Sequence, residues 1–201
     1  MRGIHLILAH SAEAGIAAVL FFIGALLAPI VYSRRMETFI AFPRWLMRKL
    51  RSFIAEEPSI PQLALLIFAF NGSAILLYML SGVVPGVPLL IALGTGLNVA
   101  LAGFLAHEER PATGPAARPL PFSVRLCAAL TFLLELPCFW YAIGMGFRMP
   151  TALDLLHGGD PNAIARRVSA YVMFILPTLL VSATVESYAV LWAARHASES
   201  T

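Results

Sequence analysis

The stretch PQLALLIFAFNGSAILLYMLSGV occupies residues 61–83 and contains no charged side chain in 23 positions. A helix needs about 20 predominantly apolar residues to cross the hydrocarbon core of a bilayer, so this stretch predicts a membrane-spanning helix. A second apolar run, over 88–106, begins after four residues, Val84 to Val87. Pro85 and Gly86 predict a tight turn in that connection, and the two runs are therefore expected to form an antiparallel hairpin.

Three further apolar runs lie outward from this pair, at about 12–32, 125–147 and 169–194. The first ends at Ser33-Arg34-Arg35 and lacks a small-residue cleavage site, so it is expected to be a retained helix. Of the 201 residues, 59% are hydrophobic and 12% are charged, whereas soluble domains are about 45–50% apolar and about 25% charged. The mean hydropathy is +0.81. The sequence therefore predicts an all-α fold with one membrane domain over 1–201, built as a polytopic transmembrane bundle of about five spanning helices.

The segment between the first and second spans is rich in both basic and apolar side chains. Apolar positions over 36–55 recur at three- or four-residue spacing, which predicts an amphipathic interfacial helix on the membrane surface. Its basic residues would face anionic lipid headgroups, and a plain basic loop is the alternative. These membrane-surface basic residues are Arg34, Arg35, Arg44, Arg48, Lys49 and Arg51. The formal net charge of +3 is too small to predict nucleic-acid binding.

The remaining connections set the expected topology. Residues 107–121 contain four prolines and predict an exposed linker that is not helical. Asp160 is expected to cap a short helix starting at Pro161. The Lys and Arg residues on the two sides of five spans number ten against four, which predicts an N-terminus outside and a C-terminus in the cytoplasm. The expected location is the cell membrane, the inner membrane of a bacterium.

Polar side chains within the spans are expected to turn inward, because each needs a partner or a wet cavity. Asn71, Asn98 and Glu135 lie near the centres of three different spans. Thr131 lies one helical turn before Glu135, and Glu186 lies about 7 Å from the centre of the last span. The sequence therefore predicts that these five side chains form an intramembrane polar cluster.

Two roles are open for Glu135. One is a proton or ion site, or a conformational hinge. The other is structural, a protonated carboxyl group that joins helices by a hydrogen bond to Asn98 or Asn71. The same two roles are open for Glu186, whose candidate local partners are Ser182, Thr184 and Ser187.

Prolines and glycines within the spans predict where helices bend and where they approach each other closely. Pro137 and Pro177 each remove a backbone hydrogen bond and are expected to kink their helices. Gly144 and Gly146 are expected at close helix contacts. The small residues at 96 and 100 favour a tight contact within the expected hairpin over a dimer interface.

Sequence motifs for catalysis are missing. No Walker loop, GxSxG, HExxH or CxxC motif occurs. The histidines lie near the expected membrane edges and no two have metal-ligand spacing, at His5, His10, His107, His157 and His196. The sequence therefore predicts no catalytic, metal or cofactor site, and the chain is expected not to be an enzyme.

Three short motifs resemble the stage II sporulation protein M family. Glu135-Leu136-Pro137, followed by Gly144-Met145-Gly146-Phe147-Arg148, is similar to the family's signature of a Glu-Leu-Pro core, small residues and an Arg at the helix exit. Val185-Glu186-Ser187-Tyr188 resembles the family's closing helix, and Asn71-Gly72 resembles the asparagine position of its second conserved span. The resemblance covers roughly residues 60–194. Thr131 and Phe132 stand where family members commonly have His-Gly.

The resemblance implies a multi-pass scaffold. The namesake of the family recruits cell-wall hydrolases during endospore engulfment, and relatives occur in bacteria and archaea that make no spores. By this analogy the chain is expected to be a non-catalytic membrane subunit or scaffold of a larger membrane complex. Its expected partners are other membrane protein subunits or further copies of itself. The alternative is a membrane transporter, permease or channel with Glu135 and Glu186 on a polar pathway.

Overall fold

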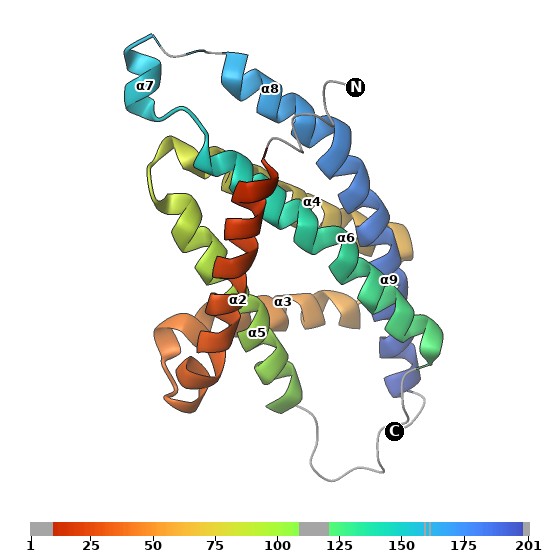
Figure 1. The fold of residues 1–201 in the computed structure, drawn as a ribbon. Coiled ribbons are helices and arrows are strands. Elements are labelled where there is room, and N and C mark those ends of the chain that lie inside the picture. Colours follow the sequence, from red (N-terminus) through yellow and green to blue (C-terminus); the bar gives the residue numbers. More distant parts are fainter. Residues whose placement is uncertain (1–9, 109–120, 159, 161, 199–201) are drawn as a thin grey trace.

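The structure is a computed structural model that describes residues 10–108, 121–158, 160 and 162–198. Within these residues every regular element is a helix (Figure 1). The α-helices are α2 (Ser11–Ser33), α3 (Glu37–Ala55), α4 (Ile60–Leu80), α5 (Val87–Glu108), α6 (Phe122–Phe147), α7 (Ala152–Leu156), α8 (Asn162–Ala170) and α9 (Leu176–Ser198). A 3-10 turn, η1 (Ser81–Val83), follows α4, and a π-helical segment, η2 (Tyr171–Ile175), joins α8 to α9.

Five helical segments of the described chain are long and apolar enough to cross a membrane, which confirms the predicted fold class. They are Ser11–Ser33, Ile60–Val83, Val87–Glu108, Phe122–Phe147 and Asn162–Arg195. The last is longer than the 169–194 span expected from the sequence, because α8, η2 and α9 follow one another without a break over 34 residues.

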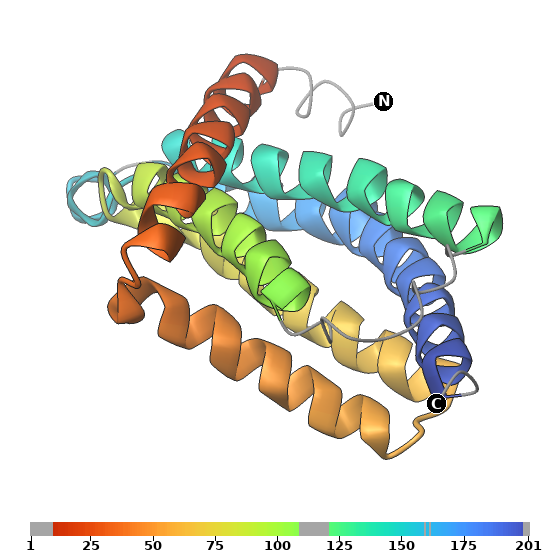
Figure 2. The same ribbon diagram turned by 90° about the horizontal axis from the view of Figure 1, so that it is seen from below.

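Helix α6 contacts two sets of helices, α2 with α5 on one side and α4 with α9 on the other. Helix α2 packs along α5 and also against α6, whereas α9 packs against both α4 and α6. Figure 2 shows α9 lying between α4 and α6, with α2 crossing on the opposite side of α6. Helix α6 therefore joins the α2–α5 pair to the group of α4, α6 and α9.

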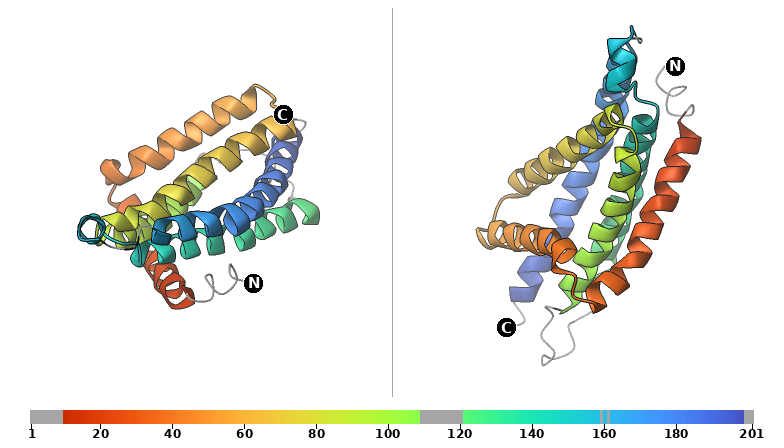
Figure 3. Two further views of the ribbon diagram at one scale, coloured as in Figure 1. Left: turned by 90° about the horizontal axis from the view of Figure 1, so that it is seen from above. Right: turned by 90° about the vertical axis from the view of Figure 1, so that its left-hand side faces the viewer.

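The prediction that the second and third spans form an antiparallel hairpin is right for the turn but wrong for the helices that follow it. Gly86 has a φ of +84°, which suits glycine in a tight turn, but α4 and α5 have few contacts and diverge from that turn (Figure 3). A four-residue connection fixes only where two helices meet. Their further course depends on which neighbour packs better, and α5 packs along α2 instead.

Glycines explain why α5 prefers α2. A Cβ atom on Gly96 would lie 1.9 Å from the carbonyl oxygen of Phe21, and one on Gly24 would lie 2.0 Å from the carbonyl oxygen of Leu93. The two backbones therefore touch at points where no other residue fits. Gly96, which the sequence suggested would contact α4, is instead part of this contact with α2.

Helix α3 runs across the long axes of α2 and α5 (Figures 1 and 3). It occupies 37–55, close to the 36–55 expected for the interfacial helix. Ile40 and Pro43 are its buried residues. Ile40 packs with Val31 of α2 and with Leu101 and Leu105 of α5, so α3 is held against the end of the α2–α5 pair.

The connections of the chain differ in part from expectation. His107 and Glu108 are the last residues of α5, so the linker expected over 107–121 starts later than predicted; residues 109–120 lie outside the described residues. Asp160 Oδ1 accepts a hydrogen bond from the amide of Asn162 at 2.9 Å, at the start of α8, while Pro161 lies outside the described residues.

Candidate intramembrane polar site

Three helices meet at the carboxyl group of Glu135. Asn71 Nδ2 on α4 donates a hydrogen bond to Glu135 Oε1 on α6 at 2.9 Å. Ser182 Oγ on α9 donates to the same oxygen at 3.2 Å. Ser182 is fully buried. The carboxyl group is thus the point that connects α4, α6 and α9, close to the middle of their membrane-spanning lengths.

The neighbouring residue on α4 provides a second contact between helices. Tyr171 Oη donates a hydrogen bond to the carbonyl oxygen of Gly72 at 2.7 Å. A Cβ atom on Gly72 would lie 3.3 Å from that phenolic oxygen, so the absent side chain leaves space for the tyrosine. This bond ties the π-helical segment η2 to α4 beside Asn71. Ile75, Met79 and other apolar side chains pack around this region.

Glu186 extends the site along α9. It lies four residues after Ser182 and therefore on the same helix face. Its Oε2 atom is buried and has no hydrogen-bond partner within the described residues. Glu186 is close enough to Glu135 for their charges to interact. A carboxyl group is costly in hydrocarbon unless it has polar neighbours, so Glu186 belongs to the same polar site as Glu135.

The structure brings together only some of the expected polar cluster. Asn71, Glu135 and Glu186 lie together, and Ser182, which the sequence suggested only as a local partner of Glu186, bonds Glu135 directly. Thr131 Oγ1 donates at 3.1 Å to the carbonyl oxygen of Cys127 in its own helix. The position of a residue in the sequence predicts its depth in the membrane. Which neighbouring helix its side chain faces depends on the rotation of its own helix about the helix axis.

Asn98 lies elsewhere. It is half-buried on α5, the helix that packs along α2, and its side chain makes no hydrogen bond within the described residues. Of the two partners suggested for Glu135, therefore, Asn71 makes the bond and Asn98 does not.

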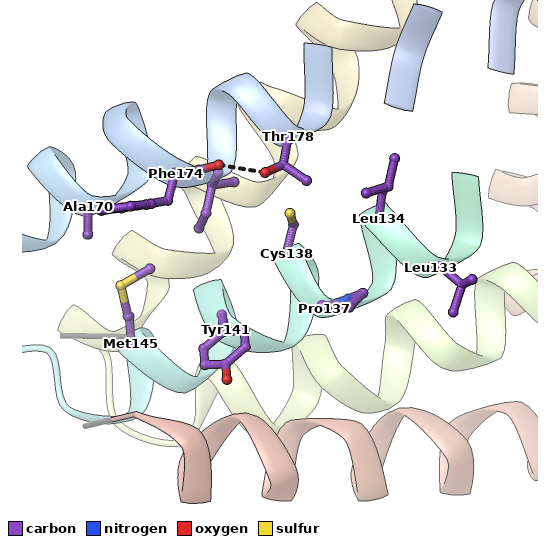
Figure 4. A pocket seen from close by; sticks show the side chains of 10 residues that line it. Leu133, Leu134, Pro137, Cys138, Tyr141, Met145, Ala170, Phe174 and Thr178 are labelled. Atoms are coloured by element: carbon purple, nitrogen blue, oxygen red, sulfur yellow. Dashed lines mark hydrogen bonds between the residues drawn. The ribbon is translucent and has the colours of Figure 1, made fainter. Parts of the chain in front are cut away.

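Next to the polar site, a mostly apolar recess of about 220 Å³ lies between α6 and the η2–α9 segment. Leu134 and Cys138, which flank Glu135 by one and three residues, belong to its lining. Figure 4 shows the Cys138 sulfur pointing toward the segment that carries Phe174 and Thr178. The recess lies in the membrane-spanning part of the bundle, and its walls are suited to apolar groups.

Two prolines lie on the helices that border this recess, and Pro137 is part of its lining. Pro137 lies inside α6, which runs through it from Phe122 to Phe147. Pro177 has no N–H group to donate four residues back. It lies two residues after the end of the π-helical segment, where the amide of Leu176 donates to the carbonyl oxygen of Tyr171 five residues back. The sequence indicated a bend at Pro177, but not the π-helical turn that precedes it. Such turns are frequent at functional sites.

The glycines of α6 allow two close contacts near the end of this helix. A Cβ atom on Gly144 would lie 2.8 Å from the amide nitrogen of Ala14 on α2. The carbonyl oxygen of Gly146 lies 1.8 Å from the position that a Cβ atom on Gly82 would take, between α6 and η1. The end of α6 therefore approaches both the first and the second span.

A charged cluster that the sequence analysis missed closes the same end of the bundle. Arg148, directly after α6, forms an ion pair with Glu13 on α2. Arg167 Nε on α8 donates at 3.3 Å to the carbonyl oxygen of Met145, and another of its nitrogens donates to the carbonyl oxygen of Arg148. Arg167 thus satisfies carbonyl groups that the end of α6 leaves open. Glu13 could have indicated this cluster, because an acidic residue in the first turn of an apolar span needs a cationic partner.

His10 lies against this charged cluster and is only 5% exposed. Burial, followed by the positive charge of Arg167, lowers the pKa of His10 below its usual value, while Glu13 acts in the opposite direction. The imidazole is therefore expected to be neutral in the folded protein at neutral pH.

The basic residues at 34–51 lie at the end of the bundle where α2 leads into α3. Arg35 has a φ of +48° in the connection between the two helices. Arg44 Nη1 forms an ion pair with Glu37 Oε2 at 2.7 Å. Arg34, Arg48, Lys49 and Arg51 are also at the surface of this part of the chain.

These helices and their internal polar contacts define a class of protein: a multi-pass α-helical membrane protein. The family model described as stage II sporulation protein M matches residues 17–190, and the chain belongs to this family. The resemblance to this family is thereby confirmed, and the match extends it from residue 60 back to residue 17, over most of the first span and all of α3. No curated protein matches the chain, and no solved structure does.

Proposed function

We propose that the chain is a non-catalytic subunit of a larger membrane complex, in which its helical bundle acts as a scaffold for other membrane proteins. The observation that carries this proposal is the use of Glu135. Its carboxyl oxygen accepts hydrogen bonds from two other helices, so the group at the centre of the family motif holds the bundle together. The charged residues at the end of α6 are used in the same way, since Arg148 and Arg167 bind other parts of the chain.

The outer surface of the bundle supports the same proposal. Large apolar side chains point outward from several spans, including Leu26, Leu90 and Leu133, which are 75%, 69% and 70% exposed. Lipid chains and partner helices can both cover such a surface, and helices associate in membranes by packing and polar contacts. A rigid bundle with an apolar exterior is suited to lateral assembly with other membrane proteins or with further copies of itself.

The proposed orientation follows from the charges of the connecting segments. The ten-to-four distribution of Lys and Arg favours α3 and the C-terminus in the cytoplasm and the Glu13–Arg148 end outside. Cysteine accessibility in intact cells tests this. A cysteine replacing Ser52 on α3 should react only after the membrane is opened, and one replacing Thr151 should react before. The reverse pattern would contradict the orientation.

The assembly proposal is tested by isolating the tagged full-length chain from native membranes in mild detergent, followed by native mass spectrometry. A defined complex of fixed stoichiometry is expected. Glu135→Gln keeps an oxygen that can accept both hydrogen bonds, so the complex should survive it. Glu135→Leu removes the acceptor and should weaken both the bundle and the complex. A chain that is always a lone monomer, at all detergent concentrations tested, would contradict the proposal.

One observation favours a second function, that of a transporter or channel. Glu186 Oε2 is buried without a partner in the described chain, near Glu135, as expected for a group that takes up and releases a proton or cation. Flux measurements in proteoliposomes distinguish the two functions. A coupled carrier should lose flux with Glu135→Gln and with Glu186→Gln but keep it with Asn98→Leu. Absence of flux in the wild-type chain under proton and Na⁺ gradients would count against this alternative.

A further inference from the structure

Helix α3 has one face against the bundle and another that remains exposed. Ile40, 2% exposed, and Pro43 form the buried face. On the far side, Phe42 and Trp45 are 49% and 48% exposed, and their rings stack with centroids 6.1 Å apart. At about 100° per residue, Trp45 lies about 140° around the helix from Ile40. The aromatic pair therefore points away from the core of the protein.

Two cations lie beside this aromatic pair. Arg48 and Lys49 follow Trp45 by three and four residues and so share its side of the helix. Both are exposed, and no ion pair or side-chain hydrogen bond from the described chain engages either of them. Arg44, in contrast, is already paired with Glu37 on the same helix. We call the exposed group of Phe42, Trp45, Arg48 and Lys49 the aromatic–basic edge.

The position of α3 places this edge at the boundary of the membrane. Three residues separate the helix from the end of the first span, and four separate it from the start of the second. It also runs across the spans (Figure 3). Trp is enriched at the level of the lipid headgroups, where its ring is half in an apolar and half in a polar environment. Cations next to it meet the phosphate groups of that layer.

We propose that the aromatic–basic edge of α3 binds anionic phospholipid headgroups, with Phe42 and Trp45 inserted at the level of the headgroups and Arg48 and Lys49 on the phosphate charge. The occupant is the anionic lipid surface, because the edge combines positive charge with apolar rings and lies beside the ends of two spans. An acidic protein segment would suit the cations but would not require the two exposed rings. The proposal does not depend on the proposed assembly function.

The test uses quenching of Trp45 fluorescence by brominated lipids in vesicles containing the full-length chain. The fluorescence of Trp45 is obtained by subtracting the fluorescence of the Trp45→Phe variant from that of the wild-type chain. Brominated phosphatidylglycerol in a phosphatidylcholine bilayer should quench it more strongly than brominated phosphatidylcholine at the same mole fraction. Arg48→Gln should lower the preference for phosphatidylglycerol about fivefold, which corresponds to ~1 kcal/mol for one cation near an anionic surface. Salt at about 1 M should lower it too.

The matched control is Arg166→Gln. This change removes one charge from an exposed guanidinium that is paired with Asp160, at the opposite end of the bundle. It should leave the lipid preference at Trp45 unchanged. Equal quenching by the two lipids, or an equal loss in both variants, would overturn the proposal. The proposal would also be overturned if neither lipid quenched Trp45, because protein rather than lipid would then cover the aromatic–basic edge.

Discussion

Replacing Asn71 with leucine removes the amide that donates to Glu135 Oε1 over 2.9 Å. The carboxyl oxygen then keeps one donor within the described chain, the Ser182 hydroxyl at 3.2 Å. Hydrogen bonds between helices in membranes contribute about 0.6 kcal/mol on average and up to about 1.7 kcal/mol, and a buried polar group left with poorer partners adds to the loss. We expect Asn71→Leu to lower the free energy of unfolding by about 1–2 kcal/mol.

The chain offers a matched control for this change. Asn98→Leu is the same substitution at a similar depth, but the Asn98 side chain makes no hydrogen bond in the described residues and is only half-buried. It should change stability by less than about 0.5 kcal/mol, or increase it, because leucine suits a lipid-facing helix better than asparagine does.

Reversible unfolding in mixed micelles, followed by near-ultraviolet circular dichroism, measures both variants. A double-mutant cycle of Asn71→Leu with Glu135→Leu should give a coupling of about 0.6–1.7 kcal/mol. Equal losses for the two asparagine variants, or fully additive effects in the cycle, would refute the reasoning, because Glu135 would then have no specific partner on α4.

Three further predictions concern the other contacts of the bundle. Gly96→Ala should destabilise the protein by about 1–3 kcal/mol in thermal unfolding, because its Cβ would lie 1.9 Å from a carbonyl oxygen on α2, while Gly103→Ala, which meets open space, should be neutral or stabilising. Arg148→Ala should cost about 1–2 kcal/mol by leaving the carboxylate of Glu13 without its cation, and Glu13→Gln in that background should recover part of the loss. The pKa of His10 is lowered in the folded protein, so the unfolded chain binds this proton first; stability should fall as the pH drops below 6.5, and His10→Gln should remove that part of the pH dependence.

The spans themselves could be read from the sequence because charge-free length is a property of one segment at a time. The stretch at 61–83 exceeds the length needed to cross a bilayer whatever surrounds it. The amphipathic pattern of 36–55 is local in the same sense, and α3 occupies nearly that range. Predictions of this kind need no knowledge of the neighbouring helices.

Pairings between helices could not be read in this way. Asn71 and Asn98 are equivalent in depth, and only the rotation of α4 and α5 about their axes decides which one meets Glu135. The sequence indicated a close contact at Gly96 but assigned it to the wrong helix, because the residues that meet Gly24 and Gly96 lie about 70 residues away in sequence. The same limit applies to Glu13 and Arg148, which are 135 residues apart.

The distribution of contacts along α6 bears on what the family motif does. Glu135 joins α6 to α4 and α9, Gly144 admits the backbone of α2, and Arg148 pairs with the start of that helix. Glu135 and Arg148 are 13 residues apart, or roughly 20 Å of helix axis at 1.5 Å per residue, and the three residues contact two parts of the bundle: α4 and α9 at Glu135, and the start of α2 at Gly144 and Arg148. If the motif served ion movement alone, only Glu135 would need its chemistry, and a glycine contact and an ion pair at the helix exit would have no reason to accompany it. A motif whose members all bring helices together is the pattern expected of a structural subunit, and this is why Glu135→Gln, which keeps the hydrogen-bond acceptor, is the substitution that separates assembly from transport.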